Sequence, residues 1–119
     1  METAMGMNVK VSAPKRTQGD VRAMFAALGV TEVRNHGDSF DVFVLSDGGN
    51  IGYAFEPAED VLTEAQFERS VWLEVRVDDV AGACAALDAL AVPRVTNAKT
   101  DHDYFRAPGG MIFRVAGLA

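Results

Sequence analysis

The chain has 119 residues, a length that fits one domain or two small halves of one. Hydrophobic residues make up 49% and charged residues 24%, an ordinary globular balance. The net charge of -6, with no basic stretch longer than Lys15-Arg16, argues against nucleic acid as a partner.

The cysteine count and the lengths of the apolar runs exclude further classes of protein. The single cysteine, Cys84, excludes an intramolecular disulfide and a zinc site built from several cysteines. No apolar run approaches the roughly 20 residues that span a bilayer, and the first residues lack the pattern of a signal peptide. We therefore expect a cytoplasmic protein with no membrane partner.

One helix and several strands are predicted in the first half. Val21, Met24, Phe25 and Leu28 recur at helical spacing, and Gly29 ends the pattern. Short apolar runs at 40–45 and 51–55 predict two strands, which a turn signal at 46–50 separates. The polar and acidic stretch 57–69 is predicted to be a linker.

The second half repeats this layout. The segment 71–77 alternates apolar residues with Trp72, Glu74 and Arg76, which predicts a strand with one apolar face. A helix is predicted from Val80 to Leu90, with Asp78 or Asp79 as its N-cap and Cys84 on its buried face. Strands are expected at 94–96, 102–106 and 111–115.

Three short echoes in the same order indicate an internal duplication. They pair Asp20-Val21 and Ala26-Ala27-Leu28 with Asp79-Val80 and Ala85-Ala86-Leu87, Gly48–Ile51 with Gly109–Ile112, and Val9–Val11 with Val75–Val77. We therefore predict a single domain, 1–119, of two strand-helix-strand-strand-strand modules at about 8–56 and 70–118.

This duplication resembles the vicinal oxygen chelate superfamily, which includes glyoxalase I, bleomycin-resistance proteins and extradiol dioxygenases. The most specific matching segments are 73–80 and 105–115. The second segment is similar to the family's Asp-Pro-Asp-Gly-Asn hairpin, although Ala107 and Gly109 replace both aspartates. The resemblance implies an α+β fold of two βαβββ modules, whose curved mixed sheets surround a cleft that a homodimer completes.

The same resemblance implies a divalent metal, held by side chains from the first and last strand of each module. Carried over residue by residue, these positions fall on Gly6, Tyr53, Trp72 and Arg114. Such a set offers no oxygen and nitrogen cage, and the arginine repels a cation. We therefore expect no metal and no other cofactor.

The two histidines are alternative candidates for chemistry. His36 lies in a turn signal and is predicted to be an exposed loop residue. His102, between Asp101 and Asp103, is either a metal or acid-base candidate or a solvated strand edge.

Alternation and the resemblance together predict an aromatic cleft without a metal. Its lining is predicted to be Trp72, Tyr53, Phe55, Glu74, Arg76 and Arg114. Trp72 either stacks on a planar ligand or fills the barrel or a dimer seam. The arginines either hold an anionic edge of the ligand or pair with Glu74.

The function predicted from this cleft is noncovalent binding and sequestration of a small aromatic or cationic molecule, such as an antibiotic, as in the bleomycin-resistance branch. Two other classes stay open. One is a metal-dependent glyoxalase- or dioxygenase-like lyase or isomerase whose ligands lie in another register. The other is a structural or regulatory module whose cavity is filled by its own side chains.

Overall fold

The computed structural model describes residues 1–96 and 102–118, which form two four-stranded mixed sheets with one long helix each. The first sheet has the order β1-β4-β3-β2, and the second has the order β5-β8-β7-β6. In each sheet the first and last strands of the module pair in parallel, and the others are antiparallel. This is the α+β fold of two βαβββ modules that the sequence predicts.

The element bounds are as follows. The first module contains β1 (Asn8–Pro14), α1 (Gln18–Ala27), β2 (Glu32–Asn35), β3 (Phe40–Val44) and β4 (Asn50–Glu56), with a 3-10 turn at Lys15–Thr17. The second contains β5 (Leu73–Val77), α3 (Val80–Ala89), β6 (Arg94–Val95), β7 (Asp103–Arg106) and β8 (Ile112–Gly117).

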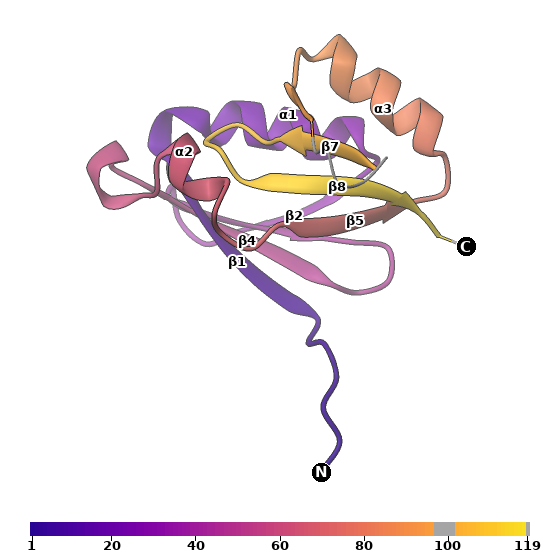
Figure 1. The fold of residues 1–119 in the computed structure, drawn as a ribbon. Coiled ribbons are helices and arrows are strands. Elements are labelled where there is room, and N and C mark those ends of the chain that lie inside the picture. Colours follow the sequence, from indigo (N-terminus) through magenta and orange to yellow (C-terminus); the bar gives the residue numbers. More distant parts are fainter. Residues whose placement is uncertain (97–101, 119) are drawn as a thin grey trace.

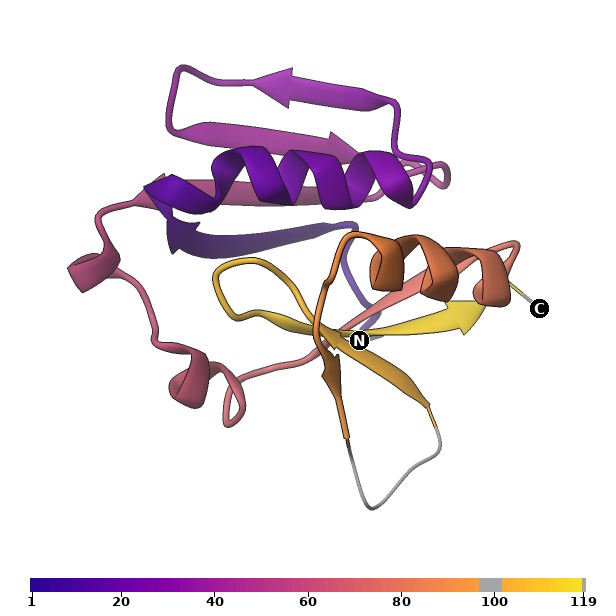
Figure 2. The same cartoon turned by 90° about the horizontal axis from the view of Figure 1, so that it is seen from above.

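Both long helices lie on the same side of the sheets, above them in Figure 1 and in front of them in Figure 2. Each sheet therefore has a helix-covered face and an open face that carries no helix. One continuous cluster of buried apolar side chains lies under the helices and draws on both modules. Within the described part of the chain, no helix has the length and apolar character needed to cross a membrane.

The first module is held by aromatic packing between α1 and its sheet. Val21, Met24 and Phe25 form the buried stripe of the helix, as their spacing predicts. The Phe25 ring stacks on Phe43 with ring centroids 4.2 Å apart. Gly29 follows the helix with a φ of 84°, a left-handed conformation that glycine adopts without a steric penalty.

The second module follows the same plan with smaller residues. Asp79 caps α3, since its side chain accepts a hydrogen bond of 2.9 Å from the backbone N–H of Gly82. Cys84 is buried on the sheet-facing side, and burial raises the pKa of its thiol. Val71 is 86% exposed, so the strand predicted from this residue begins only at Leu73.

The linker contains two short helices that the sequence analysis did not predict. These are a 3-10 turn at Ala58–Asp60 and α2 (Glu64–Phe67). Thr63 accepts a hydrogen bond from the Gln66 N–H, and the Gln66 side chain accepts one from the Thr63 N–H. The Phe67 ring is buried at the end of α2, which anchors the linker to the core.

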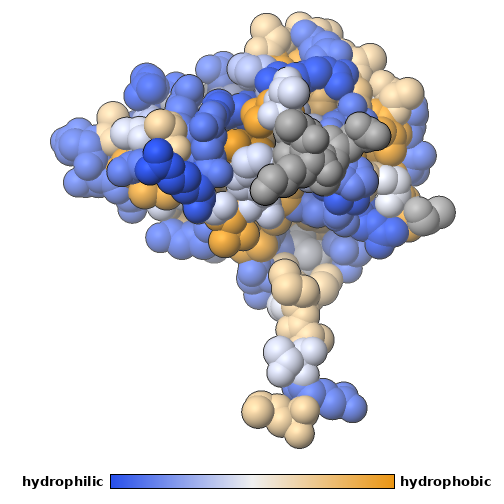
Figure 3. All heavy atoms as spheres, viewed as in Figure 1, coloured by the Kyte–Doolittle hydropathy of each residue, from blue (hydrophilic) through white to orange (hydrophobic). Residues whose placement is uncertain are grey.

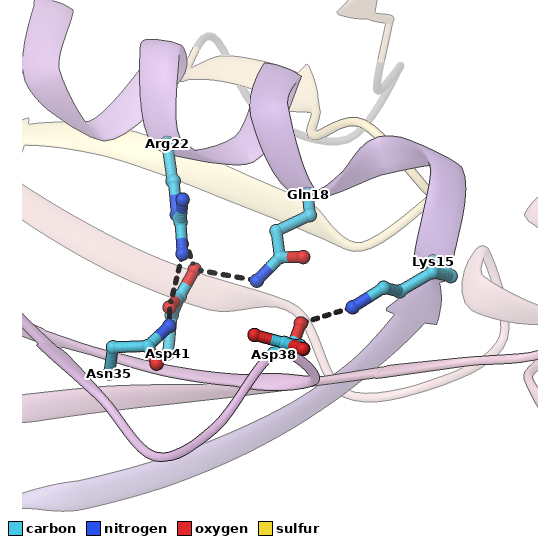
Figure 4. A network of polar contacts seen from close by, with 6 residues as sticks. All are labelled: Lys15, Gln18, Arg22, Asn35, Asp38 and Asp41. Carbon is cyan, nitrogen blue, oxygen red and sulfur yellow. Dashed lines mark hydrogen bonds and ion pairs between the residues drawn. The ribbon is translucent and has the colours of Figure 1, made fainter.

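A buried carboxylate ties α1 to the first sheet (Figure 4). Asp41 is fully buried and accepts hydrogen bonds from Arg22 Nε at 2.7 Å and Nη2 at 2.9 Å. Asn35 adds a third at 2.9 Å, and Gln18 adds a fourth at 3.3 Å. Because the Arg22 hydrogen bonds favour the ionised form, the pKa of Asp41 is lowered.

The hairpins before β4 and β8 show that one sequence echo is shifted by one residue. The Leu45 N–H bonds to the Gly49 carbonyl, and the Ala107 N–H bonds to the Met111 carbonyl. By this register Asn50 corresponds to Ile112, whereas the echo equates Ile51 with Ile112. A shift of one residue turns every side chain of a strand to the opposite face.

Candidate functional site

The open face of the second sheet gathers most of the site residues that the sequence predicts. In register, Glu74 on β5 lies beside Arg114 on β8, which lies beside Tyr104 on β7. Alternation places the remaining side chains of this open face: Trp72, Arg76, Arg106, Ile112 and Ala116. The predicted group of Trp72, Glu74, Arg76 and Arg114 therefore comes together on one face.

Two aromatic rings meet on this face. The rings of Trp72 and Tyr104 meet edge to face, with centroids 5.1 Å apart. Trp72 directly precedes β5 and Tyr104 lies on β7, and these two strands flank β8. Ile112 is fully buried although it lies outside the main core cluster. Part of the Trp72 ring therefore packs against Tyr104.

A hydrogen-bonded arginine fixes the linker beside Trp72. The side chain of Arg106 is 13% exposed and bonds to the Glu68 carboxylate at 2.6 Å. Its Nη1 donates to the carbonyls of Glu64 at 2.8 Å and Gly110 at 3.2 Å. The indole N–H of Trp72 donates to the Glu68 carbonyl at 3.2 Å. Arg106 therefore holds the segment on which the indole orientation depends.

Arg114 and Glu74 form an ion pair across the strands. The Nε of Arg114 lies 3.1 Å from Glu74 Oε2, but the geometry is off the hydrogen-bond direction. Arg76 is bound differently, because it donates to the carbonyls of Gly117 and Leu118 near the end of β8. Of the two arginines, only Arg114 has Glu74 as its partner.

A groove of about 860 Å³ runs beside this face, between β1, the linker and the start of β5. Its walls include Trp72, Glu74, Phe67, Met111 and Val71, together with β1 residues 9–12 and linker residues 59–62. Apolar surface gathers where the N-terminal segment leaves the body of the protein (Figure 3). The volume falls within the range of small-molecule sites, which have apolar walls and few polar groups.

Tyr53 and Phe55 do not lie in this cleft, contrary to the sequence-based expectation. Both rings are buried in the core under α1, where they stack with centroids 5.6 Å apart. Burial also raises the pKa of the Tyr53 phenol. The expectation depended on the shifted hairpin echo, and the residues on the open side of β4 are instead Gly52 and Ala54.

Solved structures provide the comparison that decides the fold. A protein from Bacillus anthracis that is assigned to the glyoxalase family aligns over 98% of both chains, with a TM-score of 0.73 and 13% identity. An integron cassette protein from V. cholerae covers 100% of this chain and 98% of its own, with a TM-score of 0.66 and 14% identity. The chain has the vicinal oxygen chelate fold.

Another structure with this fold is lactoylglutathione lyase from Agrobacterium tumefaciens, with a TM-score of 0.65 and 16% identity over 99% of this chain and 96% of that one. No protein-family model and no curated protein matches the sequence. At these identities the likeness establishes the vicinal oxygen chelate fold, and the chemistry has to be argued from this chain's own residues.

The residues at the positions where the sequence resemblance implies a metal do not fit one. With the register corrected, the equivalents of Trp72 and Arg114 in the first module are Asn8 and Gly52. One amide, an indole, a guanidinium and a glycine supply too few donors for a divalent cation. Within 1–96 and 102–118, no group of three or more His, Cys, Asp or Glu could hold a metal ion.

The histidines add little to this set. His36 is exposed in the turn between β2 and β3, as predicted. His102 is exposed at the start of β7, with its ring centroid 6.3 Å from that of Tyr104. Asp101, part of the candidate cluster around His102, lies outside the described residues. Asp103 binds Arg94 at 3.0 Å.

Two residues of the site escaped the sequence analysis. Tyr104 and Arg106 alternate on the predicted strand 102–106, so their common face could be read from the sequence. Their neighbours could not, because the partners of Arg106 lie in the linker and in the β7–β8 turn.

Proposed function

We propose that this protein binds a small molecule noncovalently, in the groove and on the adjoining open face of the second sheet, and sequesters it without metal chemistry. The observation that carries the proposal is the groove of about 860 Å³ whose wall includes the indole of Trp72 and the carboxylate of Glu74. The residues at the metal positions support the metal-free part. An antibiotic is one ligand that such a groove can accommodate.

The charge around the groove bears on the ligand. Glu59, Asp60 and Glu74 line it together with one cation, Lys10. A ligand that lies wholly in the groove would therefore gain from positive charge, and its flat apolar part would stack on Trp72.

A homodimer is the second part of the proposal. Val9, Leu62 and Val71 are large apolar side chains exposed at the groove. A second copy that covers them would remove apolar surface from water and deepen the groove. Sedimentation velocity at micromolar concentration should show twice the mass of one chain, and a single-chain mass would contradict this part.

Substitution of the indole tests the ligand site. Compounds that raise the melting temperature are first selected from a library of aromatic and cationic molecules, because a ligand of the native state stabilises by about 2.7 kcal/mol at a hundredfold excess over Kd. Trp72→Ala should abolish the shift caused by each selected compound. Phe40→Ala, a ring on the open face of the first sheet, is the matched control and should retain it.

Trp72→Phe separates binding from packing, because the phenyl ring keeps part of the contact with Tyr104. We expect this variant to retain the fold and to bind with reduced affinity. Unchanged affinity in both Trp72 variants, in folded protein, would place the site elsewhere. A library without any binder would contradict the proposed function.

A further inference from the structure

The charges on the open face of the second sheet do not balance. Arg76 and Arg114 share this face with one carboxylate, Glu74. The third arginine, Arg106, is neutralised by Glu68 at 2.6 Å. Among the described residues of this face one positive charge is therefore left over, in a chain whose net charge is -6.

Asp103 borders the same end of the sheet and lines the hollow beside Arg114. Its register partner Val115 belongs to the core under the helices, and its carboxylate binds Arg94 at 3.0 Å. Arg94 also binds Asp88 at 2.9 Å, so one guanidinium serves two carboxylates. The surplus of positive charge is therefore local to Arg76 and Arg114 on the open face.

The guanidinium of Arg114 has its terminal nitrogens available. Its Nε is shielded from solvent beside Glu74, whereas the side chain as a whole is 30% exposed. Within residues 1–96 and 102–118, no hydrogen-bond acceptor occupies the two Nη atoms, and they are not shielded. The ion pair at Nε therefore orients the group and leaves its fork of donors open.

This fork opens onto a hollow of about 460 Å³, whose polar lining includes Arg76, Arg114 and His102 together with the carboxylates of Glu74 and Asp103. Tyr104, the register partner of Arg114, lies on the same face and contacts Trp72 through its ring. An aromatic surface thus adjoins a planar group of N–H donors. A guanidinium can bind both oxygens of a carboxylate in parallel, with more directional contacts than an ammonium makes.

We infer that the ligand of this face is an aromatic carboxylate, whose two oxygens accept from Arg114 Nη1 and Nη2 while its ring packs against Trp72 and Tyr104. The inference rests on the proposed function and specifies the ligand class for the open face at Arg114, as distinct from the acidic groove beside it. Arg76, held by backbone carbonyls, adds positive charge beside Arg114.

The test compares 4-(trifluoromethyl)benzoate with 4-(trifluoromethyl)benzamide by ligand-observed ¹⁹F NMR titration. The two probes share ring and size and differ in charge and in the second oxygen. We expect the benzoate to bind about tenfold more tightly, the range that charge-assisted hydrogen bonds support. Arg114→Gln should bring the two affinities together, and Arg114→Lys, which keeps the charge without the fork, should lose most of the preference.

Arg34→Gln is the matched control, because Arg34 is exposed on the first sheet and paired with Glu32 at 3.5 Å. It should leave the preference intact, and thermal unfolding checks that each variant is folded. Equal binding of both probes by the wild type would overturn the carboxylate inference and leave the proposed function standing. Binding of neither probe, or a preference unchanged in Arg114→Gln, would also overturn the inference, and only the lack of any binder in the wider library would contradict the proposed function.

Discussion

Arg106 should control the orientation of Trp72 without contacting its ring. In Arg106→Gln the 2.6 Å ion pair with Glu68 and the bonds to the Glu64 and Gly110 carbonyls are lost. Because Glu68 is 57% exposed, the ion pair itself contributes little. Loss of the hydrogen bonds that the nearly buried guanidinium donates to backbone carbonyls should lower the free energy of unfolding by about 2 kcal/mol. For a chain of this size that lowers the melting temperature by about 8 °C.

Trp72 is the single tryptophan of the chain, so indole fluorescence reports on the surroundings of this one ring. With the linker released, the indole loses the Glu68 carbonyl as its acceptor and becomes more accessible to water. We expect emission at longer wavelength and stronger quenching by acrylamide in Arg106→Gln. Arg34→Gln, an exposed arginine on the other sheet, should leave both properties unchanged. A folded Arg106→Gln protein with wild-type emission and quenching would refute the role assigned to Arg106.

Further predictions concern the core. Asp41→Asn places an NH₂ group against a donor of Arg22, and it should lower the free energy of unfolding by about 2 kcal/mol at neutral pH, measured by urea denaturation against the exposed control Asp20→Asn. Because the pKa of Asp41 is lowered in the fold, its contribution is present above the unfolded value of about 3.9 and is lost as the pH falls through the folded value. The difference between wild type and Asp41→Asn should therefore shrink below about pH 4, and a constant difference would contradict the assignment. Cys84, whose thiol pKa is raised by burial, should react with a thiol reagent far more slowly in native protein than in guanidinium chloride. Equal rates in the two states would place the thiol at the surface.

The sequence was sufficient to predict most of the fold, because its elements repeat in order and each apolar pattern has a clear period. In the structure, Val21, Met24 and Phe25 form the buried stripe of α1, as their spacing predicts. The alternation around Val75 is likewise present in β5. The short helix α2 was missed, although Thr63 and Gln66 form a capping box that the sequence displays. Its polar and acidic surroundings resemble a linker more than a helix.

The site was predicted for one module and missed for the other, and a single residue explains the difference. Glycine pairs made the two hairpins look alike, but the backbone bonds pair Leu45 with Gly49 and Ala107 with Met111. Hairpin register depends on turn geometry, which short sequence echoes do not encode. Hence Trp72 and Arg114 were placed on the open face correctly, while Tyr53 was placed on the wrong side.

The contacts of Arg106 show a second limit. Its partners are backbone carbonyls in the linker and in the β7–β8 turn, and a carbonyl leaves no mark in a sequence. Only the three-dimensional arrangement reveals that an arginine on β7 supports an indole that precedes β5.

The central claim, that this vicinal oxygen chelate fold binds a small molecule without a metal, can be tested by one measurement. Protein treated with EDTA is scanned by thermal unfolding with the selected compounds, with Ni²⁺, Zn²⁺ or Mn²⁺ alone, and with each pair. We predict that the compounds raise the melting temperature in EDTA and that added metal changes neither this shift nor the ligand-free value. A shift that a metal produces alone, or that a compound produces only with metal, would contradict the claim and favour a metal-dependent enzyme.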